Sequence, residues 1–543
     1  MTDAPLPLDP EEPLPREDNP GVDARGRLIE DVAQAEIGQK SGRGALISLV
    51  ARLSNLFLTL IAQSALGRLL DPSQYGIYAM GQTALAFLLI FREFGLQAAG
   101  VQKKTLSYAE ASFLFWANLL LIGTLGALGA ISAPFVAHFY GAPQVSPVLI
   151  AMSIAAILGG VSAQHTMILR RQLRFSAIAL IDMIALAVGL VAGILVGWLR
   201  RDVWALLAMY LVQQGVTSLL SFAVSRWVPG RPNFERATHM PMLKFGAGVT
   251  AANVLYYFTN NISAILIGKG LGSALLGHYN RAQQLYQIPS TVLFSSVYVV
   301  VFSSLSRFYP TPEDYRAFYA ATLRRVSMFY MWLSGLLIFA GDDLVRVLIG
   351  PGWDIAGNML RIFAIALVGA GMAQMTGMLY QSQARVRDFQ VWGLIDSAIR
   401  ITCIVISSHW GIYGFAIGFA VSTTFVTAPA SLWFAGRKGP VSLRDQIQAI
   451  TPSTIIFALS LGGAFLGRTL SPAAGPGFVG MVLAGLGSVV LTVAIGLLIP
   501  MTRAAFIEVL GGIYRILPAG ARRFAPFASN LERAFTQTES RSA

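Results

Sequence analysis

A series of long apolar stretches sets the strongest limit on how this chain can fold. Each stretch holds about 20 mostly apolar residues, the length that a helix needs to cross a bilayer. Backbone N–H and C=O groups find no water in hydrocarbon, so they must bond within the segment. We therefore predict an all-α polytopic membrane protein with about fourteen transmembrane helices. The stretches lie at residues 44–66, 77–99, 111–133, 147–168, 177–198, 203–225, 242–267, 283–305, 320–341, 360–381, 390–409, 411–434, 447–470 and 476–500.

Composition supports this class and excludes others. Hydrophobic residues make up 55% of the 543 residues and charged residues only 12%, whereas soluble proteins carry about 25% charged residues. The net charge of +13 does not indicate a nucleic-acid partner, because the Lys and Arg residues lie in short connections between apolar stretches. The single cysteine, Cys403, excludes a disulfide framework and a thiol metal site.

The distribution of positive charge predicts the orientation in the membrane. Connections on the side of the N-terminus carry roughly 17 Lys and Arg residues, and those on the opposite side carry about seven. Both termini are therefore predicted to be cytoplasmic, since positive loops stay on that side. About the first 40 residues are rich in Pro, Asp and Glu and lack the apolar core of a signal peptide, which predicts a disordered cytoplasmic tail.

Two fixed spacings indicate that the chain contains a duplicated unit. The first spacing is 201 residues and pairs the first two stretches with the seventh and eighth. The second spacing is 214 residues and pairs the fifth stretch with the eleventh. Units six helices apart enter the membrane in the same direction, which predicts two parallel six-helix lobes around a central cleft plus two extra C-terminal helices. The matches are Gly67, Arg68, Leu70, Gly76, Tyr78 and Gln82 with Gly268, Lys269, Leu271, Gly277, Tyr279 and Gln283, and Arg171, Phe175, Leu180, Ile181 and Asp182 with Arg385, Phe389, Leu394, Ile395 and Asp396.

The stretches and the repeat together predict five segments. A disordered cytoplasmic tail is followed by an N-lobe of helices 1–6, a C-lobe of helices 7–12, the last two helices, and a cytoplasmic tail that is amphipathic and basic. In the same order, these segments cover residues 1–43, 44–230, 231–436, 437–500 and 501–543.

Charged residues inside the stretches are candidates for function, because a buried charge in a membrane is costly. Arg52 lies in the first stretch, and Arg92 and Glu93 lie near the cytoplasmic end of the second. Arg52 and Glu93 either form a structural pair or leave a cationic site for an anionic substrate group.

Two aspartates in later stretches have different surroundings. Asp396 and Arg400 are four residues apart and share one helix face, so they can neutralise each other. Asp182 has no arginine four residues on, because that position is Leu186. It either caps its helix, meets Arg174 or serves as an ion-coupling site.

Uncharged polar residues offer a second set of candidates. Asn253, Asn260 and Gln374 either bond between helices or line a hydrated path for sugar hydroxyls. Arg281, near an external helix end, either reaches toward the bilayer surface or contacts a phosphate that is leaving the cleft.

The sequence shows no motif of an enzyme that uses nucleotides or metals. It contains neither a P-loop nor an HExxH motif. We therefore expect no catalytic residues, no cofactor and no metal site. The five histidines do not form a ligand set; they are His138, His165, His239, His278 and His409.

An ordered set of short runs resembles one family of membrane proteins. The runs are LLDPSQYGIYAM (69–80), FREFGLQAAGVQ (91–102), RRQLRFSAIALID (170–182), YNRAQQLYQIP (279–289), SLSR (304–307) and IGPGW (349–353). They resemble the Wzx-like oligosaccharide flippases of the multidrug/oligosaccharidyl-lipid/polysaccharide (MOP) superfamily, of the colanic-acid and teichuronic-acid exporter type. The resemblance covers about residues 40–500.

The resemblance implies a flippase of the bacterial inner membrane. Its substrate would be an oligosaccharide linked through pyrophosphate to undecaprenol, moved from the cytoplasmic to the periplasmic leaflet by alternating access. Ion gradients are expected to drive such transporters, which makes Glu93, Asp182 and Asp396 the coupling candidates. Membrane lipids, a polysaccharide polymerase and the chain-length or export machinery are the implied partners, and nucleic acid is not among them.

Three rival functions differ from this one in testable ways. A multidrug or cation antiporter of the same superfamily favours acidic or aromatic residues in the cleft rather than arginines. A membrane-embedded polysaccharide polymerase or ligase requires a large external loop with an acid or base. A scaffold of a polysaccharide assembly complex requires no transport cycle.

Replacing Arg52, Arg92 and Arg400 together by alanine is predicted to reduce polysaccharide export by about tenfold or more, because each hydrogen bond to a charged group contributes about 1.5–3 kcal/mol. The measurement is secreted polysaccharide from cells that carry only the variant, with membrane levels checked by immunoblot. Unchanged export at normal protein levels contradicts a cationic cleft.

Overall fold

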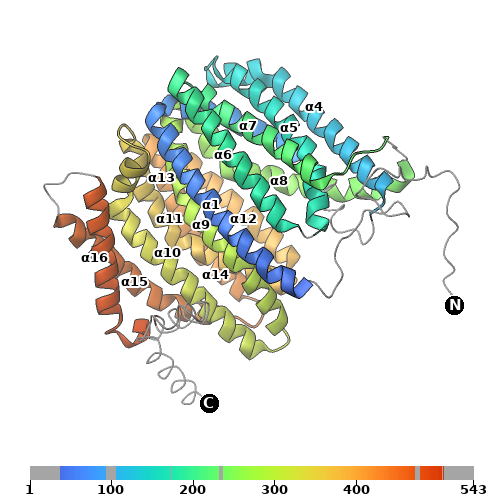
Figure 1. Cartoon of the computed structure of the whole chain (residues 1–543). Helices are drawn as coiled ribbons and strands as arrows, with labels where there is room; N and C mark the ends of the chain where they lie inside the picture. The colour runs from blue at the N-terminus through green and yellow to red at the C-terminus, as the bar shows by residue number, and fades with distance from the viewer. Residues whose placement is uncertain are drawn as a thin grey trace, which may run out of the picture. The chain divides into compact units, whose positions relative to one another are not determined.

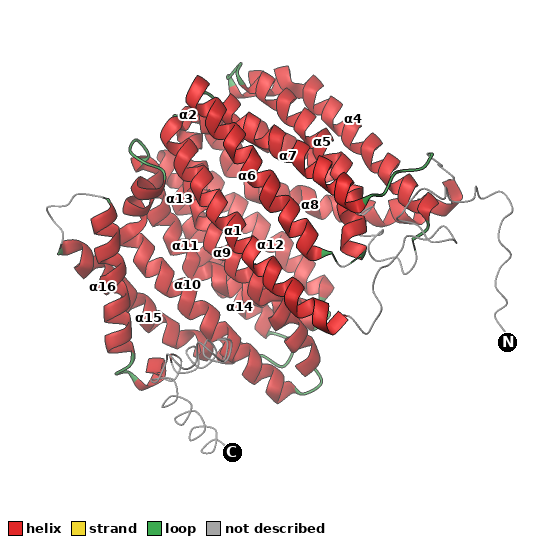
Figure 2. Cartoon of the chain, viewed as in Figure 1, coloured by secondary structure: helices red, strands yellow, loops and turns green. Residues whose placement is uncertain are grey.

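The computed structural model describes residues 37–92, 106–172, 174–231, 236–470 and 477–503, together with Phe506. Within these ranges all regular elements are helices, joined by short connections (Figures 1 and 2). Most of the predicted N-terminal and C-terminal tails lies outside the described residues.

Each of the fourteen predicted stretches overlaps a helix. Nine helical segments of the described residues are long and apolar enough to cross a membrane, so the all-α polytopic class is confirmed and the count of fourteen stays a prediction. The helices are α1 Ile37–Leu69, α2 Pro72–Leu89, η2 Ile90–Arg92, α4 Tyr108–Tyr140, α5 Val145–Arg171, α6 Phe175–Arg200, α7 Trp204–Ser225, α8 Arg236–Gly270, α9 Ser273–Phe308, α10 Pro312–Leu348, α11 Asp354–Ser382, α12 Val386–Ser407, η3 Ser408–Trp410, α13 Gly411–Val421, η4 Ser422–Thr427, α14 Ala428–Gly436, α15 Leu443–Thr469 and α16 Phe478–Gly496.

The chain forms two compact units, and α8 contributes to both. Unit 1 consists of residues 1–261 with 272–274, and unit 2 of residues 262–271 with 275–543. The central cleft and the lobe limits at 44–230 and 231–436 stay predictions.

In unit 1, α5 lies at the centre of the packing. It contacts α2, α4 and α7, while α6 packs between α1 and α7. Near the end of α5, the fully buried Trp227 packs edge-on against Phe115 and His165, at ring distances of 6.0 and 5.6 Å. This aromatic cluster holds the segment after α7 against α4 and α5.

In unit 2, α10 is the helix that the others share. It packs against α11, α15 and α16, whose labels surround it in Figure 1. On the other side, α11 contacts α13, the π-helical turn η4 and α14. The two helices that fall outside the repeat, α15 and α16, are therefore part of the core of unit 2.

The 201-residue repeat recurs in the structure. The turn from α1 to α2 begins with Leu70 N–H donating to Leu66 O, and the turn from α8 to α9 begins with Leu271 N–H donating to Ile267 O. The next helices start at Pro72 and Ser273. Both turns therefore have the same hydrogen bond and the same length in the predicted register.

The 214-residue spacing is wrong, because the equivalent turns are 211 residues apart. Arg174 and Arg385 each precede the first residue of a helix, α6 and α12 respectively. The Nη1 of Arg174 donates to Val224 O at 3.2 Å, and the Nη1 of Arg385 donates to Ala435 O at 3.1 Å. The 211-residue spacing therefore relates both partners of this bond, and it pairs Arg174, not Arg171, with Arg385.

The physical reason for the error is the helical period. An α-helix repeats every 3.6 residues, so a shift of three residues returns nearly the same face to the same neighbours. Apolar helices can therefore match in a neighbouring register, whereas the turn fixes the true one. With a spacing of 211 residues, Asp182 corresponds to Gly393 and not to Asp396.

Glycine contacts join α15 to α16. A Cβ added to Gly463 would lie 2.3 Å from Gly487 O, whereas a Cβ added to the adjacent Gly462 would meet only a leucine methyl at 3.6 Å. The first distance is too short for any side chain, so the two backbones pack directly at Gly463.

Gly463→Ala is predicted to destabilise the protein by about 1–3 kcal/mol, the usual cost of overpacking, and to lower its thermal unfolding midpoint in detergent. Gly462→Ala is the matched control and should leave the midpoint nearly unchanged. Equal midpoints for the two variants contradict the direct backbone packing.

Candidate functional site

The candidate site begins with an ion pair on α12 of unit 2. The Nε of Arg400 lies 2.9 Å from Asp396 Oδ2, and the two side chains are 20% and 23% exposed. The pairing that the four-residue spacing predicted is therefore confirmed. A partly buried pair keeps a guanidinium inside the protein, because the carboxylate offsets its charge.

An aromatic cluster lies beside the guanidinium of Arg400. Its Cζ lies 6.0 Å from the ring centre of Phe419 on α13. Phe419 in turn contacts Tyr286 of α9 and Phe363 of α11, each at a ring distance of 5.5 Å. The positive charge therefore lies at the edge of an aromatic cluster.

A tyrosine and a glutamine extend the polar groups toward α10 and α11. The hydroxyl of Tyr330 on α10 donates to Gln374 Oε1 at 3.0 Å. Tyr286 lies near both Arg400 and Tyr330. These contacts bring three of the predicted residues into one site, named here the Arg400 cluster, which consists of Tyr286, Tyr330, Gln374, Asp396, Arg400 and Phe419.

The chemistry of the Arg400 cluster suits binding rather than bond making. A guanidinium presents several N–H donors in a planar fork that matches a phosphate or carboxylate. The tyrosine hydroxyls and the amide can bond to neutral polar groups. Within the described ranges, no group of three or more His, Cys, Asp and Glu residues is placed to hold a metal ion.

Sequence reasoning missed the aromatic members of the cluster. Tyr286 lies in the run 279–289 that carries the family resemblance, so this motif could have pointed to it. Tyr330 and Phe419 lie in apolar stretches whose composition gives no such signal. Their role depends on packing between α9, α10 and α13, which only the structure shows.

The remaining candidate in unit 2 bonds within its own helix. Arg281 is half-buried on α9, and its Nη1 donates to Gln284 Oε1 at 2.7 Å. The structure therefore does not bring Arg281 into the Arg400 cluster, and its contact with substrate stays a prediction.

The candidates on the first two helices are only partly described. Arg92 is half-buried at the end of η2. Arg52 lies in α1, but its side chain is outside the described part of the chain, as is all of Glu93. The Arg52–Glu93 pair therefore stays a prediction.

The other candidates of unit 1 lie on α6 and α8. Asp182 on α6 is exposed and has Arg170 as an electrostatic neighbour. Asn253 is half-buried, while Asn260 is exposed and its amide nitrogen donates to Tyr256 O of the same helix at 2.7 Å. The amide nitrogen of Asn260 thus bonds within α8 rather than to a neighbouring helix.

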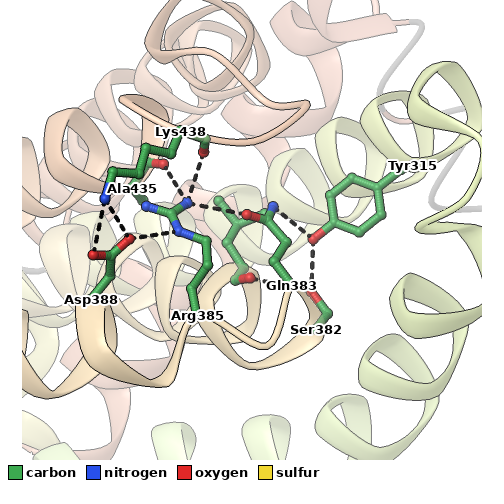
Figure 3. A network of polar contacts seen from close by, with 8 residues as sticks. Tyr315, Ser382, Gln383, Arg385, Asp388, Ala435 and Lys438 are labelled. Carbon is green, nitrogen blue, oxygen red and sulfur yellow. Dashed lines mark hydrogen bonds and ion pairs between the residues drawn. The ribbon is translucent and has the colours of Figure 1, made fainter.

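A second polar network, the Arg385 network, holds the turn between α11 and α12 (Figure 3). The Nη1 of Arg385 donates to three oxygens: Gln383 Oε1 at 3.1 Å, Ala435 O at 3.1 Å and Lys438 O at 2.7 Å. Its Nε donates to Asp388 Oδ2 at 2.9 Å. One side chain therefore bonds to the carbonyl groups that the end of α14 leaves unpaired.

Two further contacts complete the Arg385 network. Lys438 Nζ lies 3.3 Å from Asp388 Oδ1, and Gln383 Nε2 donates to the hydroxyl of Tyr315 at 3.1 Å (Figure 3). The turn is thereby fixed to the start of α10 and to the segment after α14. In unit 1, the 211-residue spacing places Trp227 where Lys438 stands, so an aromatic cluster replaces the charged contacts.

The fold is that of a multi-pass helical membrane protein. The structure is similar to that of the lipid II flippase MurJ in an inward closed conformation, with a TM-score of 0.66 and 14% identity, covering 84% of this chain and 98% of MurJ. It is also similar to an inward-facing multidrug resistance MATE family transporter of the MOP superfamily, with a TM-score of 0.54 and 16% identity, covering 75% of this chain and 99% of that one. At these identities the likeness shows the fold alone.

Sequence comparison gives the family. The chain belongs to the family described as polysaccharide biosynthesis protein, whose model matches residues 65–357, more than half of the chain. The predicted resemblance to Wzx-like exporters is thereby confirmed.

Curated relatives support the same assignment. The chain is 23% identical over 385 residues to the lipopolysaccharide biosynthesis protein WzxC of Escherichia coli K12, covering 70% of this chain and 78% of WzxC. It is 27% identical over 323 residues to the succinoglycan biosynthesis transport protein ExoT of Rhizobium meliloti, covering 59% of this chain and 64% of ExoT. It is 23% identical over 385 residues to the teichuronic acid biosynthesis protein TuaB of Bacillus subtilis, covering 70% of this chain and 76% of TuaB.

Arg385→Ala is predicted to destabilise unit 2 by on the order of 2–3 kcal/mol, because backbone carbonyls and a carboxylate lose their charged donor. Arg387→Ala, two residues on and exposed, is the matched control. The measurement is thermal unfolding in detergent. A midpoint for Arg385→Ala as high as that of the control contradicts a stabilising role for the network.

Proposed function

We propose that this protein moves a lipid-linked oligosaccharide across the bacterial inner membrane, from the cytoplasmic to the periplasmic leaflet. The observation that carries the proposal is the guanidinium of Arg400, held inside unit 2 of a polysaccharide biosynthesis protein by Asp396 and Phe419. The names of WzxC, ExoT and TuaB associate those proteins with three different glycans, which supports a glycan substrate here.

The physical problem of transport explains the need for such a site. A pyrophosphate and a sugar chain cannot enter hydrocarbon without losing their hydration, which costs several kcal/mol for each unpaired polar group. An arginine can replace part of that hydration by bonding a phosphate through two parallel N–H groups. Gln374 and Tyr330 supply groups for the hydroxyls of the sugar.

A comparison of the two repeated units supports a role of the Arg400 charge in function rather than in folding. At the 211-residue spacing, its counterpart in unit 1 is Gly189. A Cβ on Gly189 would lie 2.7 Å from Met209 O, so unit 1 packs its helices closely at the position where unit 2 carries a charge. The repeated fold therefore does not require an arginine there.

The pairing with Asp396 suggests how the empty site is kept stable. Without substrate, the carboxylate neutralises Arg400, and a bound phosphate takes over this role. Asp396 then loses its cation and becomes a candidate for proton uptake, with Asp182 and Glu93 as further coupling candidates. Arg52, Arg92 and Arg281 are proposed to contact the anionic group elsewhere on its path.

The proposed function also implies which proteins act before and after this one. The protein acts as a transporter and not as an enzyme, and its undecaprenyl-pyrophosphate substrate comes from enzymes that build the oligosaccharide. A polymerase that uses the transported unit, and the machinery that exports the polymer, are its proposed partners. Both termini are proposed to lie in the cytoplasm, on the basis of the positive charges in the connections.

Arg400→Ala is predicted to reduce flipping of a fluorescent lipid-linked oligosaccharide in proteoliposomes by about tenfold or more, which corresponds to one lost charge-assisted contact of 1.5–3 kcal/mol. Arg400→Lys keeps the charge but loses the planar fork, so we expect an intermediate rate. Arg387→Ala, exposed on the same helix, should flip normally.

Two results would count against the proposal. One is a normal rate for Arg400→Ala, which removes the substrate-binding role of the Arg400 cluster. The other is proton-driven efflux of cationic drugs by the wild-type protein without flipping of lipid-linked sugars, which favours the multidrug antiporter instead.

A further inference from the structure

A charged cluster joins α10, α15 and α16 of unit 2 and shares no residue with the Arg400 cluster. Asp342 and Asp343 lie near the end of α10, and Arg468 lies in the last turn of α15. Gly477 directly precedes the first residue of α16. Because the two aspartates follow directly on the predicted span 320–341, the cluster lies at the predicted external edge of the bilayer.

Asp342 forms an ion pair with Arg468, the arginine of this cluster. The Nη1 of Arg468 donates to Asp342 Oδ1 at 2.7 Å, and its Nη2 donates to Asp342 Oδ2 at 2.6 Å. The same Nη1 also donates to Phe339 O. The two parallel bonds to Asp342 are the strong bidentate geometry of an arginine and a carboxylate.

The neighbouring aspartate is buried and only half bonded. Asp343 is 0% exposed, and its Oδ1 accepts the N–H of Gly477 at 2.7 Å. No hydrogen-bond donor of the described residues reaches its Oδ2, and Arg468 Nη1 lies 3.4 Å away. A Cβ on Gly480 would lie 3.1 Å from this oxygen, so α16 covers it closely.

Two further arginines lie near the aspartates, and the charge of Arg346 has the weakest effect of those that act on Asp343. Arg346 of α10 lies 2.9 Å from Asp354 of α11, and these two side chains are 39% and 67% exposed. The Nε of Arg361 on α11 donates to Ile338 O at 2.7 Å, and its charge acts on Asp342. From α16, Asp343 receives a backbone amide and no charge. Burying a charged carboxylate with so little support is costly, and uptake of a proton removes that cost.

We propose that Asp343 is a proton-binding site, with the proton on Oδ2 and Arg468 left to Asp342 alone. Loss of the proton to water places two carboxylates on one guanidinium and weakens the attachment of α15 and α16 to α10. The site lies where α10 meets the two helices outside the repeat, and it shares no residue with the Arg400 cluster, so it can be tested separately from the proposed binding of substrate at Arg400.

The two adjacent aspartates should respond to pH in opposite directions. Burial raises the pKa of Asp343, against the weaker effects of the Gly477 amide and Arg468. Its contribution to stability is therefore complete below the ordinary aspartate pKa and is lost as pH rises through the raised value. For Asp342, burial alone would raise the pKa, but the hydrogen bonds and charge of Arg468 hold it below the ordinary value. Its contribution is lost as pH falls through that lowered value.

The test compares thermal unfolding midpoints of the full-length protein with those of Asp343→Asn and Asp342→Asn in detergent, from about pH 4 to pH 8. The advantage of wild type over Asp343→Asn should grow as pH falls. Its advantage over Asp342→Asn should stay nearly constant over this range, because the lowered pKa of Asp342 lies below it. A difference between wild type and Asp343→Asn that is constant or grows with pH overturns the proposal.

Infrared spectroscopy provides a second measurement that needs no unfolding. In mildly acidic buffer, wild type should show the carbonyl band of a protonated carboxyl group, which Asp343→Asn lacks. Asp343→Glu keeps a carboxyl group and should show a shifted band, so it serves as the comparison if the asparagine variant does not fold. A wild-type spectrum without any such band in acidic buffer also overturns the proposal.

Discussion

Every polar group that this chain takes into the membrane must find its partner within the chain. The backbone meets this requirement by forming helices, and each of the fourteen apolar stretches overlaps one of them. Side chains meet it one at a time: Arg400 pairs with Asp396, Gln374 accepts the hydroxyl of Tyr330, and Asn260 donates back to its own helix. The positions of these pairs decide where the protein can carry a charge, and hence where it can hold a polar substrate.

Sequence patterns predicted those features that depend on neighbours along the chain. Apolar length predicted the helices, and the spacing of Asp396 and Arg400 predicted their ion pair, because residues four apart share a helix face. The 201-residue register was also correct, since it rests on a turn that both halves keep. The 214-residue register failed because an apolar helix looks much the same when it is shifted by nearly one turn.

Contacts between distant helices could not be predicted in this way. Phe419 and Tyr286 sit beside Arg400 only because α9, α12 and α13 pack together. Arg468 and Asp342 are 126 residues apart, and each alone looks like an ordinary charge at the end of a helix. An ion pair thus joins α15 to α10, and close glycine packing joins α15 to α16, although both helices lie outside the repeat.

The corresponding turns of unit 1 and unit 2 are held by different kinds of contact. In unit 2, Lys438 and Arg385 share the carboxylate of Asp388, and Lys438 is largely exposed. In unit 1, the corresponding position is the buried Trp227, packed among aromatic rings. Dissolved salt weakens exposed ion pairs, whereas it does not screen the packing of aromatic rings. A rise in ionic strength would therefore weaken the Lys438–Asp388 contact of unit 2 and spare the corresponding Trp227 packing of unit 1.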